Sequence, residues 1–177
     1  MKPDFIQDYF GLFGLQPAFH VDTTTLELTY RDLQSMVHPD RYAHTHAAER
    51  RLSMQWATRV NEAYRTLKDP LLRAQYLLAR QGVDVGEESN IAMPPQFLME
   101  QMEWREAVAE ARGAEDIDEL GRLLTRLRGE SNDVLREVAS AIDENKDFTA
   151  AADAVRRLMF VHKLQQDIND ALESLET

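Results

Sequence analysis

The stretch LELTYRDLQSMVHPDRYAHTHAAERRLSMQWATRV, residues 26–60, decides the fold. In its first part the apolar side chains recur every three or four residues, as one face of a helix requires. They are Leu26, Tyr30, Leu33 and Val37. Pro39 disfavours helical geometry at the residue before it, so this helix should end there. The stretch therefore predicts two amphipathic helices joined by a stiff polar loop that displays His38 and Asp40.

Helical patterns continue on both sides of this pair. Asp22 is the expected N-cap of the helix over 23–37, and Gly82 should end the helix over 70–81. The helices expected before Gly82 cover residues 4–13, 23–37, 46–68 and 70–81. The helix over 46–68 should bury one row of side chains, namely Leu52, Trp56, Val60, Ala63 and Leu67. Because no stretch alternates apolar and polar residues for long and no Asn-Gly or Asp-Gly hairpin signal occurs, we expect an all-α fold.

The segment 82–95 contains two Gly and two Pro, which places a domain boundary there. Three longer helices should follow, over 96–112, 115–145 and 150–175, as an antiparallel three-helix bundle. The middle helix has its seam at Ile117, Leu120, Leu124, Leu127, Ser131, Val134 and Val138. The last has its seam at Ala154, Leu158, Val161, Gln165, Ile168, Leu172 and Leu175. The expected domains are residues 1–81, a linker over 82–95, and residues 96–177.

Composition excludes several classes of function. The chain has 177 residues and a net charge of −11, and it has no cysteine, which rules out disulfides, thiolate zinc sites and a cysteine nucleophile. Residues 81–177 carry 10 Lys and Arg against 22 Asp and Glu, a balance that repels nucleic acid. No apolar run could span a bilayer and no Gly-rich loop could cradle a phosphate. We therefore expect a cytoplasmic protein without a bound cofactor, metal, membrane or nucleic acid.

The tripeptide His38-Pro39-Asp40 is the sharpest local feature. At about 100° per residue, Arg31, Gln34 and His38 share one flank of their helix, away from its apolar stripe. A plain helix stop with a surface histidine is the simpler interpretation. A second alternative is a small metal-dependent hydrolase that uses His38, Asp40, His44 and His46, and it predicts bound metal and turnover by the isolated protein.

Three separated motifs resemble a J domain, the module that stimulates ATP hydrolysis by DnaK-class chaperones. They are DYFGLFGL at 8–15, YRDLQSMVHPDRY at 30–42 and NEAYRTLKDP at 61–70. Three later motifs resemble the HscB family, the co-chaperones of iron–sulfur cluster biogenesis. These are LLRAQYLL at 71–78, PQFLMEQMEWRE at 95–106 and AAADAVRRLMFVHKL at 150–164. The resemblance implies an N-terminal J domain joined in an L shape to a C-terminal three-helix bundle.

The resemblance also implies two partners and the residues that bind them. A DnaK-class, HscA-type ATPase chaperone would contact Arg31, Gln34, His38, Pro39, Asp40 and Arg41. An iron–sulfur scaffold protein of IscU type would contact Leu98, Met99, Met102, Glu103, Glu106 and Phe160. The chain would then be no enzyme but a co-chaperone that activates the ATPase and delivers the scaffold to it. A J protein that serves a different client is the alternative.

One departure from the J-domain pattern concerns charge. J domains usually carry several basic residues on the helix before H-P-D, whereas this chain offers Arg31 there and Arg41 just beyond. The electrostatic part of docking should therefore be weaker, with Gln34 contributing by hydrogen bonding.

Helical phase gives an independent view of the bundle surface. Leu98, Met99 and Met102 lie 100–200° from Phe97 at about 100° per residue, and Phe160 also lies off its seam. Either a partner covers these side chains or the protein's own helices do. The apolar residues Leu71, Leu72, Tyr76, Leu77 and Leu78 exceed what one helical stripe can use, so we also expect their helix to pack against the bundle.

Overall fold

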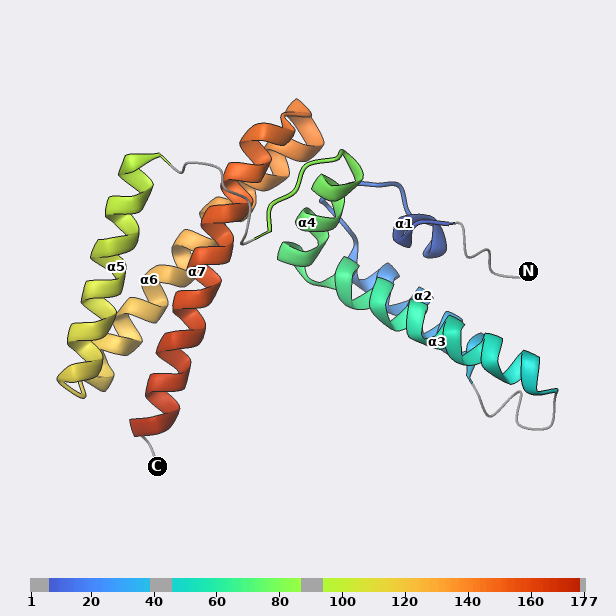
Figure 1. Ribbon diagram of the computed structural model, residues 1–177, viewed down its shortest axis with the longest axis horizontal. Helices are drawn as coiled ribbons and strands as arrows, with labels where there is room; N and C mark the ends of the chain where they lie inside the picture. The colour runs from blue at the N-terminus through green and yellow to red at the C-terminus, as the bar shows by residue number, and fades with distance from the viewer. Residues whose placement is uncertain (1–6, 39–45, 87–93, 176–177) are drawn as a thin grey trace. The chain divides into compact units, whose positions relative to one another are not determined.

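The computed structural model describes residues 7–38, 46–86 and 94–175 (Figure 1). Every regular element in these ranges is a helix, which confirms the all-α fold class. The chain divides into two compact units, Met1–Arg80 and Gln81–Thr177. None of the helices in the described ranges is long and apolar enough to cross a membrane.

The first unit is built on an antiparallel pair, α2 (Thr23–Val37) and α3 (Ala47–Lys68). Two shorter helices, α1 (Tyr9–Leu12) and α4 (Pro70–Arg80), pack against α3. The side chains at the centre of this unit are at most 1% exposed: Phe10, Leu26, Val60, Ala63 and Leu67. Trp56 of α3, 4% exposed, extends this core. The expected helix over 23–37 is confirmed at both ends.

Aspartates set where most of the helices begin. The side chain of Asp22 accepts hydrogen bonds from the backbone N–H groups of Thr24 (2.9 Å) and Thr25 (3.4 Å). These N–H groups have no partner within the helix, so the bonds fix the first turn and confirm Asp22 as N-cap. The Thr25 hydroxyl, which donates to Oδ2 of Asp22 at 2.7 Å, lowers the pKa of Asp22 the most, and the two backbone bonds lower it further. The same arrangement precedes α1 and α4, at Asp8 and Asp69, and the helices that begin at Ile117 and Phe148, at Asp116 and Asp147.

The buried row of α3 differs from the expected one at its start. Leu52 was expected in the core and is 46% exposed, whereas Ser53 is 4% exposed. Ser53, three residues before Trp56, lies on the buried face of α3. Leu52, four residues before Trp56, lies outside that face. A serine suits this place because α2 ends against it. Its Oγ donates to the backbone carbonyl of Val37 at 2.8 Å, which satisfies a carbonyl of the last helical turn.

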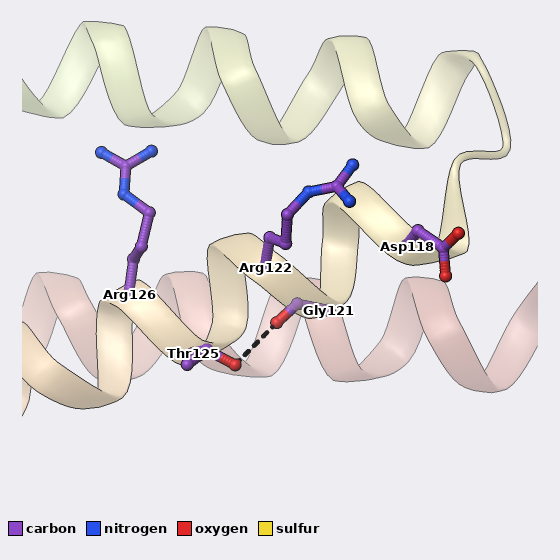
Figure 2. A pocket seen from close by; sticks show the side chains of 5 residues that line it. All are labelled: Asp118, Gly121, Arg122, Thr125 and Arg126. Atoms are coloured by element: carbon purple, nitrogen blue, oxygen red, sulfur yellow. Dashed lines mark hydrogen bonds between the residues drawn. The ribbon is translucent and has the colours of Figure 1, made fainter.

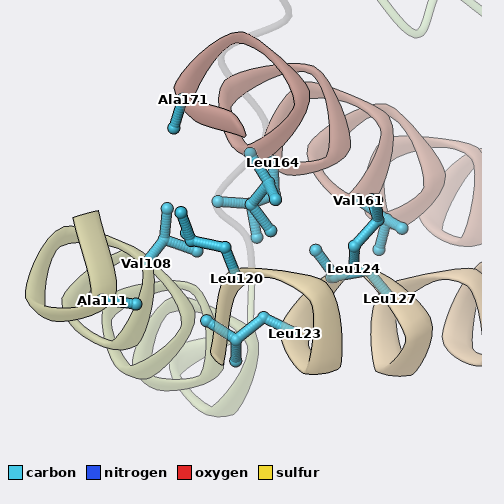
Figure 3. Packing of buried hydrophobic residues seen from close by; sticks show 10 residues of the cluster. Val108, Ala111, Leu120, Leu123, Leu124, Leu127, Val161, Leu164 and Ala171 are labelled. Atoms are coloured by element: carbon cyan, nitrogen blue, oxygen red, sulfur yellow. The ribbon is translucent and has the colours of Figure 1, made fainter. Parts of the chain in front are cut away.

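The second unit is a three-helix bundle of α5 (Pro95–Gly113), α6 (Ile117–Ala139) and α7 (Phe148–Leu175). Figure 3 shows leucines of α6 between α5 and α7. The core at this end of the bundle consists of Val108, Ala111, Leu120, Leu123, Leu124, Leu127, Val161, Leu164, Ile168 and Ala171. Trp104 of α5 is partly buried against this cluster. The expected bundle of three helices is therefore confirmed.

Two expectations for the middle helix are wrong. Ile117 was placed on the seam but is 45% exposed, because it is the first residue of α6 and the buried row starts one turn later at Leu120. The helix also does not continue unchanged to residue 145. Its last six residues, Ser140–Asn145, form a π-helix. This helix ends at Lys146, whose φ of 55° lies in the left-handed region.

Candidate functional site

The polar flank of α2 is exposed where the sequence predicts it. Arg31, Gln34 and His38 all face solvent. The side chain of Arg31 is 69% exposed, and its Nη2 lies 2.6 Å from Oε1 of Glu27. His38 is the C-cap residue, with an extended ψ of 128°, so α2 ends as expected directly before the proline. Residues Pro39, Asp40 and Arg41 lie outside the described ranges.

A hydrogen-bonded network joins this flank to α3. The Tyr30 hydroxyl donates to Oδ1 of Asn61 at 2.9 Å. Nε2 of Gln34 donates to the Tyr30 hydroxyl at 2.7 Å and to Oδ1 of Asn61 at 3.3 Å. Tyr30 was expected in the apolar stripe, and it is half-buried with its hydroxyl in this network.

Aromatic stacking supports the same seam. The rings of Tyr30 and Tyr64 stack with centroids 3.8 Å apart and planes 8° from parallel. Nζ of Lys68 lies 3.0 Å from the Tyr64 hydroxyl, and this bond raises the pKa of Lys68. Sequence reasoning missed Asn61 and Tyr64. Their spacing of three residues on α3 places them on one helical face, but nothing in the sequence shows which face of α2 they meet.

Of the four residues in the alternative metal site, only two lie in the described ranges. His38 and His46 are exposed, whereas Asp40 and His44 lie outside the described ranges. Among the residues that the structure describes, no group of three His, Asp or Glu side chains could hold a metal ion. The hydrolase hypothesis therefore stays a prediction that includes undescribed residues.

The bundle carries an exposed apolar surface on α5. Leu98, Met99 and Met102 are 47%, 62% and 70% exposed. The other helices of the bundle therefore leave these three side chains uncovered. The two glutamates that follow on the same helix, Glu103 and Glu106, are also exposed and flank the apolar side chains.

Phe160 of α7 is half-buried and lies beside α5. Its ring contacts the ring of Phe97 edge to face, with centroids 5.9 Å apart. The guanidinium of Arg105 lies 5.7 Å from the centroid of the Phe160 ring. Phe160 of α7 therefore lies next to α5, the helix that presents the exposed methionines. Part of the Phe160 ring also packs against the bundle core.

A separate open groove lies along α6, and Figure 2 shows two arginines that extend from α6 toward α5. Its lining residues are Asp118, Gly121, Arg122, Thr125 and Arg126. Arg122 pairs with Glu119 at 2.7 Å, and the guanidinium of Arg126 lies 4.8 Å from the Trp104 ring centroid. The contact of Arg126 joins α6 to α5, whereas the ion pair of Arg122 lies within α6.

Glu130 of α6 is a partly buried carboxyl whose surroundings change its pKa. Burial raises the pKa of this carboxyl, and the nearby carboxylate of Glu100 raises it further. Arg157 and Arg126 act in the opposite direction but do not reverse the shift.

An antiparallel helix pair joined through His38-Pro39-Asp40, followed by a three-helix bundle, defines the class of J-domain proteins with a helical C-terminal domain. Residues 93–169 match the family model of the HSCB C-terminal oligomerisation domain. The chain is 58% identical over 177 residues to the co-chaperone protein HscB homolog of Aromatoleum aromaticum, which covers 100% of both proteins. The chain therefore belongs to the HscB co-chaperone family.

Solved structures agree with this assignment. The crystal structure of human co-chaperone protein HscB matches with a TM-score of 0.90 and 32% identity, over 99% of this chain and 86% of that one. Chaperone HscB from Vibrio cholerae matches with a TM-score of 0.83 and 35% identity, over 96% of this chain and 99% of that one.

Proposed function

We propose that this protein stimulates the ATPase of an Hsp70-type chaperone of the HscA type and delivers an IscU-type scaffold protein to it, in support of iron–sulfur protein maturation. The observation that carries the proposal is the 58% identity to a co-chaperone over the whole chain, because it spans both units. Residues 1–81 would act as the J domain, 82–95 as the linker and 96–177 as the scaffold-binding domain.

The chaperone-docking surface in this proposal consists of Arg31, Gln34, His38, Pro39, Asp40 and Arg41. The exposure of its described members on one flank of α2 supports the assignment. His38 acts as an interface residue and transfers no proton. Docking activates the ATPase by favouring the partner's hydrolytic state, to an extent set by the difference in affinity for that partner's two states.

The scaffold-binding surface consists of Leu98, Met99, Met102 and Phe160, with Glu103 and Glu106 as its polar rim. Exposed methionines support this role because the thioether side chain adapts its shape to a partner surface. Carrying both surfaces on one chain raises the effective concentration of scaffold protein at the chaperone, which favours the ternary complex.

A steady-state ATPase assay of the partner chaperone tests the proposal, with and without the scaffold protein. His38→Gln should abolish stimulation and leave the melting temperature nearly unchanged, because exposed substitutions usually alter stability by less than about 0.5 kcal/mol. A combined Leu98→Ser, Met102→Ser and Phe160→Ala variant should lose scaffold binding and keep the basal stimulation. Stimulation by His38→Gln equal to wild type, or equal loss of both activities in the folded triple variant, would refute the two-surface proposal.

A further inference from the structure

The side-chain amide nitrogen of Gln34 makes two hydrogen bonds within the protein. One donor bond goes to the Tyr30 hydroxyl at 2.7 Å and the other to Oδ1 of Asn61 at 3.3 Å. These two acceptors hold Nε2 on the side of α3. The opposite end of the amide, Oε1, accepts no hydrogen bond from the described residues, and the residue is exposed.

Asn61 is the residue that fixes this orientation. Its Oδ1 accepts from both the Tyr30 hydroxyl and the Gln34 amide, so one atom of α3 sets the direction of two side chains of α2. The ring of Tyr30 is held in turn by its stack on Tyr64. Preorganisation of this kind lowers the cost of ordering side chains when a partner binds.

We propose that Asn61 is a positioning residue of the chaperone-docking surface, which orients Gln34 so that its Oε1 accepts a hydrogen bond from an N–H donor of the partner. The proposal rests on the assigned docking role of α2 and extends the functional surface to α3. The lack of net positive charge on α2 agrees with docking through such a hydrogen bond. Glu27, Arg31 and Asp32 give this helix a balance of −1, and Arg31 is paired with Glu27, so little free positive charge is available for docking.

The test is a double-mutant cycle in the full-length chain, using stimulation of the chaperone ATPase as the readout. Asn61→Leu removes the acceptor and keeps the number and branching of the side-chain heavy atoms. It should raise the concentration for half-maximal stimulation roughly three- to tenfold, the equivalent of one neutral hydrogen bond, and leave the maximal stimulation unchanged. In a Gln34→Leu background the same substitution should have almost no further effect, because Asn61 acts through Gln34.

Gln55→Leu is the matched control, since it also replaces an exposed amide of α3 but lies away from the network. It should stimulate like wild type. A spectroscopic readout is the side-chain amide signal of Gln34, whose two hydrogens should exchange slowly in the free protein and stay protected in the complex.

Three results would overturn the proposal: wild-type stimulation by Asn61→Leu, additive effects of the two substitutions, or rapid exchange of the Gln34 amide hydrogens. If the wild-type chain does not stimulate the ATPase at all, the proposed function itself fails, which is a distinct outcome.

Discussion

Met102 gives the most direct test of the scaffold-binding surface. Full burial of a methionine side chain is worth about 1.5–3 kcal/mol. Since Met102 is 70% exposed, about 1–2 kcal/mol of this remains to be gained on binding, and alanine loses most of it. We therefore expect Met102→Ala to weaken scaffold binding roughly five- to thirtyfold. Titration calorimetry of the full-length chain with the scaffold protein measures the change, and circular dichroism should show an unchanged melting temperature.

The matched control is Met54→Ala on α3. Met54 is 60% exposed, so this variant makes the same chemical change at similar exposure but in the other unit. It should bind the scaffold protein like wild type. The reasoning fails if Met102→Ala binds within twofold of wild type, or if both variants lose affinity equally.

Two further predictions concern stability. Ser53→Ala leaves the carbonyl of Val37 without its buried partner and should lower the free energy of unfolding in urea by about 1–2 kcal/mol. The control Thr58→Ala, at an exposed position, should lower it by less than about 0.5 kcal/mol. Equal losses in the two variants would contradict the assigned role of the buried bond. Burial and Glu100 raise the folded-state pKa of Glu130, so its charged form lowers stability at neutral pH and this penalty is relieved as the pH falls through that pKa. Glu130→Gln should therefore melt higher than wild type at about pH 7 and lose this advantage near pH 4; a difference that grows on acidification would refute the assignment.

Local signals in the sequence were sufficient to predict most of the fold. The helix over 23–37 has an aspartate cap before it and a proline after it, and both act within a few residues of the boundary they set. The π-helical turn at Ser140–Asn145 has no such signal, because it depends on how the ends of α6 and α7 meet. Leu52 was misplaced since its hydrophobicity suggested burial, whereas contact with the end of α2 favours the smaller neighbouring serine.

The two candidate surfaces also differ in how much of each could be predicted from the sequence. Helical phase alone separated Leu98, Met99 and Met102 from the core, and their exposure confirms it. The part played by Asn61 could not be predicted, because a hydrogen bond between residues 34 and 61 depends on the packing register of two helices. Periodicity shows which side of a helix is polar, but it does not show which side chain of another helix lies opposite.

The two tryptophans of the chain are divided between its units, Trp56 in the buried core of the first and Trp104 beneath Arg126 in the second. Intrinsic fluorescence therefore contains one reporter for each unit, with different surroundings. Replacing either indole with phenylalanine leaves an emission signal that follows a single unit. The folding of the helix pair and of the bundle can then be timed separately in the same full-length chain, without an attached dye.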